Sequence, residues 1–164
     1  MMELSILTCC SLLAERQLKI AFAESATAGA LSASFAQTPY SGTILQGSIV
    51  CYDAEVKSDL LNIPLSFILE LTPESAEVTR TMALRTKELF KKADIVVAVT
   101  GLTKSGGSET KEKPVGTVFI HFIFPGDQIQ VREVFSGNSH QIIRQIIQKV
   151  ADVLVEHFTK SVMV

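Results

Sequence analysis

The segment "DIVVAVTG", residues 94–101, is an almost unbroken run of β-branched residues that ends at Thr100 and Gly101. Such a run is typical of a central strand that helices cover on both faces. Upstream, "KIAFAESATAGALSASF", residues 19–35, begins as a short buried strand and continues, from about Thr27, as a tightly packed helix. Two buried strands with helical neighbours indicate an α/β protein.

Apolar spacing and turn residues place the remaining elements around these strands. The predicted helices lie at residues 3–16, Thr27–Gln37, Asp53 to just before Pro64, about Thr72–Lys92, and Ser139–Phe158. The predicted strands lie at Leu18–Ala23, Thr43–Tyr52, residues 94–101, and Val115–Phe124 with Gln128–Phe135 as a hairpin. This order predicts a mixed β-sheet in a three-layer α/β/α sandwich, and the length suits a single domain over residues 1–164.

Two of the predicted helices have specific start signals. Asp53 opens "DAEVKSDLL" and is a good N-cap. Thr72 precedes Pro73, which suits the first helical position, and Glu74 and Glu77 then lie near the positive end of the helix dipole.

Composition restricts the classes of partner. Fifteen Lys plus Arg balance seventeen Asp plus Glu, so the net charge is −2 and no basic stretch suggests nucleic-acid binding. The apolar share is 47%, and no run approaches the roughly 18 apolar residues of a membrane span. The N-terminal residues lack the basic region and cleavage site of a signal peptide. We therefore expect a cytoplasmic protein that acts on a small molecule, without nucleic-acid or membrane partners.

The three cysteines offer no metal site. Cys9, Cys10 and Cys51 show neither a C-x-x-C pattern nor a histidine at ligand spacing, so we expect reduced, buried thiols and no metal or cofactor. Cys51 could alternatively be a nucleophile, but no histidine lies near it in the sequence and its strand context is apolar.

Ser25 stands where the first strand passes into a helix. In α/β proteins ligands collect at the carboxyl ends of strands, here "AES" and "VTG". A serine at such a junction is exposed beside free backbone N–H groups, which suits a nucleophile or a phosphate ligand. The alternative is a plain N-cap serine, which is common in proteins.

A lysine can activate a serine that has no histidine partner, if burial keeps part of its amine neutral. Lys57, five residues after Tyr52, is the candidate. The alternative is an exposed Asp53–Lys57 pair on a helix, which contributes only a few tenths of a kcal/mol.

The polar loop after the central strand is the second candidate region. Thr100, Gly101 and the segment Ser105–Thr110 supply hydroxyls and N–H donors that could hold a phosphate. Neither a Walker A nor a G-x-G-x-x-G pattern is present, so a nucleoside triphosphate or dinucleotide is not indicated. The alternative is a solvated loop.

Four motifs together resemble the C-terminal domain of competence/damage-inducible protein A, whose stand-alone members are nicotinamide-nucleotide amidases. "AESATAG" resembles the family's A-E-S-C-T-G-G, and "YDAEVK" its Y-x-x-x-x-K. "AVTG" resembles its A-V-T-G, and "GGSETKEKPVGTVFI" its glycine loop followed by E-K-P-V-G-T-V. The resemblance spans essentially the whole chain, with the motifs in the family's order.

The resemblance implies hydrolysis of nicotinamide mononucleotide to nicotinic acid mononucleotide and ammonia, without metal or cofactor. It implies Ser25 as nucleophile, Lys57 as base, and Tyr52 and Thr100 as further active-site residues. Glu24 would anchor the loop by hydrogen bonding. The expected substrate-binding residues are Glu24, Ala26, Thr27, Gly101, Gly106, Gly107, Ser108 and Arg144, with backbone N–H groups near Ala26 and Thr27 holding the oxyanion and the glycines near the 5′-phosphate.

Two departures from the family pattern leave other functions open. Ala26 and Ala28 replace the family's cysteine and first glycine, and a methyl at residue 28 could crowd the helix start. Where many members have F-x-G-D-R, this chain has "FSGNSH", so Arg144 would have to compensate. The alternatives are a catalytically weak nucleotide-binding or regulatory relative, or a hydrolase of another small amide or ester. Close packing of Ala28, Gly29 and Ser32 could support a homo-oligomer.

Overall fold

A computed structural model describes residues 4–160 of the chain. Its helices are α1 (Leu4–Glu15), α2 (Ala30–Ala36), α3 (Ser41–Ile44), α4 (Ala54–Leu61), α5 (Leu65–Leu71), α6 (Ala76–Leu89) and α7 (Ser139–Lys160). Its strands are β1 (Ile20–Glu24), β2 (Leu45–Val50), β3 (Ile95–Gly101), β4 (Thr117–Phe124) and β5 (Asp127–Val134).

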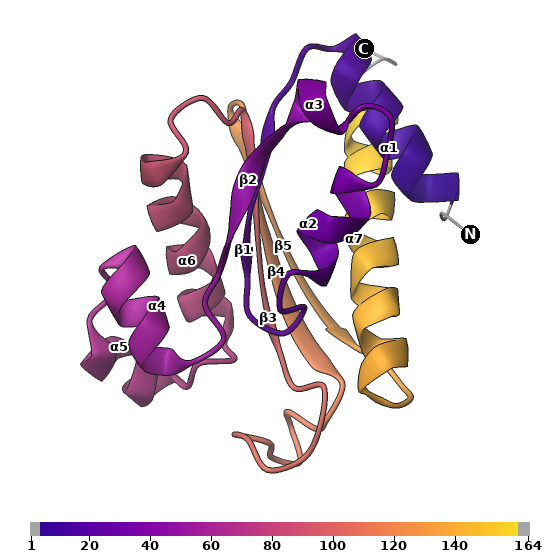
Figure 1. The fold of residues 1–164 in the computed structure, drawn as a ribbon. Coiled ribbons are helices and arrows are strands. Elements are labelled where there is room, and N and C mark those ends of the chain that lie inside the picture. Colours follow the sequence, from indigo (N-terminus) through magenta and orange to yellow (C-terminus); the bar gives the residue numbers. More distant parts are fainter. Residues whose placement is uncertain (1–3, 161–164) are drawn as a thin grey trace.

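The five strands form one sheet in the order β2-β1-β3-β4-β5. β1 pairs in parallel with β2 and β3, whereas β4 pairs antiparallel with β3 and β5. Helices α4, α5 and α6 cover one face, and α1, α2, α3 and α7 lie on the other (Figure 1). The prediction of a three-layer α/β/α sandwich with a mixed sheet is confirmed.

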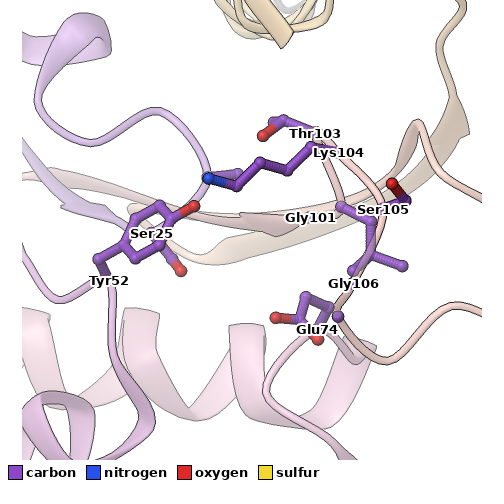
Figure 2. A pocket seen from close by; sticks show the side chains of 11 residues that line it. Ser25, Tyr52, Glu74, Gly101, Thr103, Lys104, Ser105 and Gly106 are labelled. Carbon is purple, nitrogen blue, oxygen red and sulfur yellow. The ribbon is translucent and has the colours of Figure 1, made fainter.

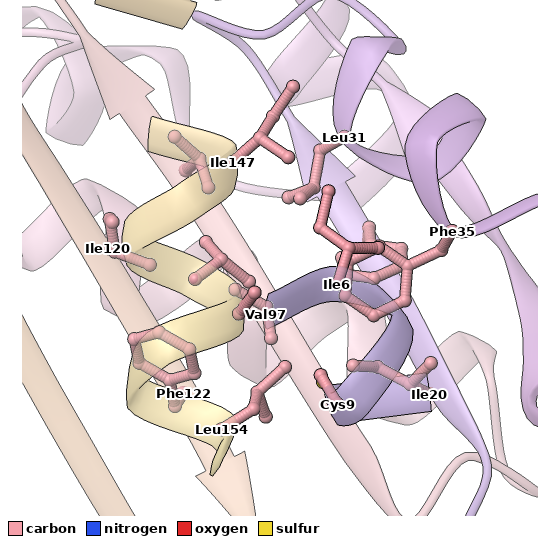
Figure 3. Packing of buried hydrophobic residues seen from close by; sticks show 14 of the residues in the cluster. Ile6, Cys9, Ile20, Leu31, Phe35, Val97, Ile120, Phe122, Ile147 and Leu154 are labelled. Carbon is pink, nitrogen blue, oxygen red and sulfur yellow. The ribbon is translucent and has the colours of Figure 1, made fainter. Parts of the chain in front are cut away.

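The run that predicted the central strand is buried on both faces. Ile95, Val97 and Val99 belong to the core under α1, α2 and α7, whereas Val96 and Ala98 belong to the core under α4, α5 and α6. Figure 3 shows the first core, in which side chains from α1, α2 and α7 converge on the sheet. Because neither face meets water, every position of the strand can be apolar.

β1 shows the same alternation with side chains of different size. Phe22 faces the α7 side, and Ala21 and Ala23 face the α6 side. Because successive side chains point to opposite faces, Glu24 continues the Phe22 side and Ser25 the alanine side. Their hydrogen bonds agree, since Glu24 binds α2 and Ser25 meets α4. The end of β1 therefore places the Glu24 carboxylate and the Ser25 hydroxyl on opposite faces of the sheet.

The predicted start of α6 was wrong. Thr72 has a positive φ of 67°, which is uncommon for a β-branched residue, and the helix begins at Ala76 instead. The N-cap is Ser75, whose hydroxyl accepts a hydrogen bond from the Val78 N–H. Residues 72–74 therefore form a turn, which brings Glu74 out of the helix.

The start of α2 is also later than predicted. Ala28 and Gly29 have φ values of 48° and 96°, so the helix begins at Ala30 rather than at Thr27. Left-handed backbone disfavours alanine, so the departure from glycine at residue 28 carries conformational strain. The short helices α3 and α5, of four and seven residues, were not predicted.

Candidate active site

Glu24 organises the turn that follows β1. It is wholly buried, and its carboxylate accepts hydrogen bonds from Thr27 Oγ1, from Ser48 Oγ, and from the backbone N–H groups of Gly29, Leu31 and Ser32. Burial raises the pKa of Glu24, but the hydrogen bonds from Ser32, Thr27 and Ser48 outweigh burial and lower the pKa overall. The charged form is thus built into the fold and anchors the loop.

The turn presents Ser25 with two amide groups beside it. The Ser25 N–H donates to Val99 O at 3.0 Å, which ties the turn to β3. Within residues 4–160, the N–H groups of Ala26 and Thr27 make no hydrogen bond. Donors of this kind can stabilise an oxyanion. The Ser25 hydroxyl therefore has candidate oxyanion donors in the same turn.

Lys57 reaches this hydroxyl from α4. Its side chain is wholly buried, with Nζ 3.1 Å from Ser25 Oγ and 2.9 Å from the carbonyl oxygen of Tyr52. Asp53 instead caps α4 by accepting from the Glu55 N–H. The alternative of an exposed Asp53–Lys57 pair is wrong.

Burial lowers the pKa of Lys57, whereas the Cys51 thiolate, at a pH where it forms, and the carboxylates of Glu74 and Asp53 act in the opposite direction. Burial also raises the pKa of the Cys51 thiol to about 11, so that thiol stays neutral near pH 7. Cys51 is wholly buried as well, which argues against it as a nucleophile. The amine at Lys57 is the group whose protonation this environment changes.

A pocket of about 220 Å³ opens in front of Ser25. Figure 2 shows the side chains that line it, which come from the β1 and β3 strand ends, the segment before α4, the turn before α6, and the loop after β3. The lining residues are Ser25, Ala26, Tyr52, Glu74, Gly101, Leu102, Thr103, Lys104, Ser105, Gly106 and Gly107. The pocket thus lies at the carboxyl ends of parallel strands, where α/β folds bind ligands.

Several predicted site residues support the pocket without lining it. Thr100 is wholly buried, and its hydroxyl shares a 2.7 Å hydrogen bond with Thr79 on α6. Thr27 is buried and donates to Glu24.

Gly101 does line the pocket, and a Cβ there would lie 2.9 Å from the Val118 side chain. Glycine is therefore required at residue 101 by space.

Arg144 lies apart from these residues. It is exposed on α7 and lines a different groove with Ser136, Gln141, Gln145 and Gln148. Asn138 and Ser139, which stand at the position of the family arginine, have structural contacts: Asn138 Oδ1 accepts from the Gln141 N–H, and Ser139 Oγ donates to Thr103 O. No arginine lines the pocket among the residues that the structure describes.

The loop after β3 carries an anion of its own. The N–H groups of Gly106 and Gly107 both donate to the Glu109 carboxylate, each at 2.8 Å. These hydrogen bonds lower the pKa of Glu109. The two donors expected near a phosphate are therefore engaged by a carboxylate of the same loop.

Sequence reasoning missed two charged residues that line the pocket, Glu74 and Lys104. It also gave no role to Lys113, whose Nζ donates to Thr72 Oγ1, Glu74 O and Ser108 Oγ. Lys113 lies in the motif "EKPVG", which was a usable signal. Glu74 had none, because its place depends on the turn before α6.

Between residues 4 and 160, no group of three or more His, Cys, Asp or Glu side chains could hold a metal ion. In the same part of the chain, no helix is long and apolar enough to cross a membrane.

These features define an α/β/α-sandwich domain with a pocket at the carboxyl ends of its parallel strands. The chain belongs to the CinA C-terminal domain family, which matches residues 5–158. A CinA-like protein of Prochlorococcus marinus subsp. pastoris is 36% identical over 131 residues, which cover 79% of this chain and 30% of that protein. A CinA-like protein of Gemmatimonas aurantiaca is 34% identical over 148 residues, covering 90% of this chain and 34% of that protein. The chain thus spans about a third of the length of these curated relatives.

Solved structures share the fold. A competence-damaged protein (CinA) superfamily protein from Klebsiella pneumoniae superposes with a TM-score of 0.87 at 22% identity, covering 95% of this chain and 96% of that one. A competence/damage inducible protein from Agrobacterium tumefaciens has a TM-score of 0.80 at 21% identity, covering 95% and 97%. The α/β/α fold is therefore that of the CinA superfamily.

Proposed function

We propose that this chain is an amidohydrolase that converts nicotinamide mononucleotide to nicotinic acid mononucleotide and ammonia. The observation that carries the proposal is the wholly buried Lys57 amine 3.1 Å from Ser25 Oγ. A buried lysine loses part of its charge, and a neutral amine can accept a hydroxyl proton. The resemblance of the motifs around both residues to nicotinamide-nucleotide amidases supplies the substrate.

The reaction proceeds through an acyl-enzyme. Ser25 Oγ attacks the carboxamide carbon while its proton passes to the neutral Lys57 amine. The N–H groups of Ala26 and Thr27 hold the oxyanion of the tetrahedral intermediate. As the intermediate collapses, the C–N bond breaks and Lys57 gives its proton to the departing ammonia, which leaves an ester on Ser25.

Water completes the turnover at the same pair. Lys57, neutral again, takes a proton from water as the water oxygen attacks the ester carbon, and returns a proton to Ser25 as the acid departs. The Tyr52 carbonyl, 2.9 Å from Lys57 Nζ, accepts one amine hydrogen and so orients the lone pair toward Ser25. These steps need neither metal nor cofactor.

Lys104 is the residue we assign to the 5′-phosphate. It is the basic side chain among the residues that line the pocket, and it is exposed, so a dianion would attract it. Gly106 and Gly107 can contribute only if Glu109 moves off their N–H groups. Phosphate binding at the loop therefore implies that Glu109 is displaced.

One observation favours a second candidate. The pocket lining has no arginine, and the Gly106 and Gly107 donors are engaged, so the site offers few ready anion ligands. This favours either a weak nucleotide-binding relative or hydrolysis of a small amide without phosphate. A cytoplasmic location, and a homo-oligomer packed through Ala28, Gly29 and Ser32, stay predictions.

Ammonia release from nicotinamide mononucleotide separates these candidates. We expect the wild type to be active, Ser25→Ala and Lys57→Ala to be inactive yet folded, and Lys92→Ala, which removes an exposed lysine outside the pocket, to keep full activity. A wild type that binds the nucleotide without hydrolysing it would support the binding module. Faster hydrolysis of unrelated amides would support the other hydrolase. Full activity in Lys57→Ala would remove the lysine as base.

A further inference from the structure

The pocket lining includes two charged side chains, Glu74 and Lys104. The proposed mechanism gives no role to a carboxylate side chain. Figure 2 shows them on different sides of the pocket, with Glu74 arising from the turn before α6 and Lys104 from the loop after β3. A half-buried carboxylate at a binding site is costly unless a hydrogen bond or a cation compensates it. Glu74 therefore needs an explanation.

Glu74 is held in position by several contacts. Ser108 Oγ donates to Glu74 Oε2, and Lys113 Nζ donates to both the Glu74 carbonyl and the Ser108 hydroxyl. Thr72, two residues before Glu74, has a φ of 67°, a strained conformation for threonine. Strained backbone persists where surrounding contacts enforce it, and it concentrates at functional sites.

One oxygen of this carboxylate is left for a ligand. Oε2 accepts the Ser108 hydrogen bond, whereas Oε1 accepts none from any residue in the described part of the chain. Neither oxygen forms a salt bridge with a described lysine or arginine. The carboxylate thus raises the pKa of the nearby Lys57 and Lys113 amines, but it makes no direct hydrogen bond to either one.

The charge does not help Lys57 act as a base. Negative charge at Glu74 opposes the effect of burial on the Lys57 pKa, and so favours the ammonium form that cannot accept a proton. A pocket that served this base alone would be better without the acid. The acid is, however, placed to act on a charge that enters the pocket.

Resting on the proposed function, we propose that Glu74 is a specificity-determining residue that selects substrates with a cationic ring. In nicotinamide mononucleotide, a single ring carbon separates the ring nitrogen from the carbon that bears the carboxamide. The ring nitrogen therefore lies close to Ser25 when the carboxamide reaches it. The pyridinium charge therefore enters the same 220 Å³ pocket that Glu74 lines. The free carboxylate oxygen then faces the cation, and neutral aromatic amides of the same shape bind more weakly.

The test measures binding without turnover, in a Ser25→Ala background of the full chain. Dissociation constants are compared for nicotinamide mononucleotide and for benzamide riboside 5′-phosphate, in which a neutral benzene ring replaces the pyridinium. We expect the cationic ligand to bind about tenfold more tightly, as for a partly screened charge pair. Adding Glu74→Gln, which keeps an acceptor for Ser108, should reduce that ratio to about one.

Two control variants isolate the charge. Glu77→Gln removes an exposed acid from the same helix start outside the pocket, and should leave the ratio unchanged. Ser108→Ala removes the loop tether without changing charge, and should affect both ligands equally.

The failures can be told apart. A ratio near one before Glu74 is changed, or a ratio that Glu74→Gln leaves unaltered, overturns the role of Glu74 and leaves the amidase proposal intact. If neither ligand binds and the wild type releases no ammonia, both proposals are overturned.

Discussion

The two walls of the pocket are built differently. The strand wall is Ser25 with the turn that follows β1, and Lys57 lies behind it. The loop wall is the loop after β3 together with Glu74. On the strand wall, Ser25 is 5% exposed and Lys57 is 0% exposed, and the turn between strand and helix is fixed by five hydrogen bonds to Glu24. On the loop wall, Lys104 and the two glycines are exposed, and Glu109 bonds within its own loop.

Under the proposed function, this difference gives the two walls separate tasks. A base that works by losing its charge needs burial and fixed neighbours, which only the strand wall supplies. Recognition of a charged substrate needs long polar side chains. These side chains are in contact with water in the free protein, and the ligand displaces that water when it binds. We therefore expect substitutions on the strand wall to change turnover and stability, and substitutions on the loop wall to change affinity.

The largest expected effect is that of Lys57→Met on turnover. Removing the base should lower kcat by about 10²–10⁴-fold, the usual contribution of general acid–base catalysis. The same change removes a buried ammonium that is costly to take out of water, so the free energy of unfolding should rise at neutral pH. Ammonia release and urea denaturation measure the two quantities, and a variant that loses both activity and stability would contradict this assignment.

The pH dependence of that stability gain has a definite sign. Because the folded pKa of Lys57 lies below 10.5, the ordinary pKa of a lysine, the unfolded chain binds more protons between these two pKa values. The wild type therefore gains stability as the pH rises through this window. The advantage of Lys57→Met should be greatest below the folded pKa and should shrink as the pH approaches 10.5.

Glu24→Gln tests the support beneath the strand wall. The glutamine side chain would place its own N–H groups opposite the N–H and O–H groups that now donate to the carboxylate. We therefore expect a loss of about 2–3 kcal/mol in the free energy of unfolding. Because the pKa of Glu24 is lowered, its stabilising effect is complete above about pH 4.5 and is lost as the pH falls through the folded pKa. Glu77→Gln, on an exposed site, is the control. Equal stability of the two variants would show that the Glu24 network carries little energy.

Lys104→Met tests the loop wall. We expect KM for nicotinamide mononucleotide to rise about tenfold with little change in kcat, because one charge-assisted contact to the phosphate is lost. Nicotinamide riboside, which lacks the phosphate, should show no such change. Lys111→Met removes an exposed lysine of the same loop that does not line the pocket. A fall in kcat with unchanged KM would contradict the division between the walls.

Ala28→Gly has the smallest expected effect. Ala28 has a φ of 48°, and glycine adopts left-handed backbone without the steric penalty of a Cβ. We expect the free energy of unfolding to rise by about 1 kcal/mol. Ala33→Gly, the same substitution at an exposed position inside α2, should lower it by a similar amount. Thermal unfolding of both variants measures the difference.

The strand wall could be predicted from sequence because its signals are local or follow simple alternation. The β-branched run at residues 95–99 defined β3, and the position of Ser25 after β1 placed a hydroxyl at a strand end. Asp53 capped α4 as expected. That Lys57 bends inward to Ser25 could only be expected from the family resemblance, because local pattern favoured an exposed lysine.

Gly106 and Gly107 were predicted on the loop wall and do line the pocket, but its charged residue Glu74 escaped prediction for a physical reason. Glu74 lies two residues after Thr72, whose φ is positive, and no residue pattern at "LTPES" requires that conformation. The pair Thr72–Pro73 instead matched a helix start, although the hydroxyl of Ser75 is the cap. Contacts with Lys113 and Ser108, far along the chain, hold this turn in place. Long-range contacts of this kind leave no local signal.

The central claim is that the Lys57 amine is partly neutral where it meets Ser25. The most direct measurement is an NMR titration of the Lys57 side chain nitrogen, assigned by its absence in Lys57→Met. We predict a change from ammonium to amine below pH 10.5, which is the ordinary pKa of a lysine side chain. A lysine that stays an ammonium up to or beyond that pH would contradict the account.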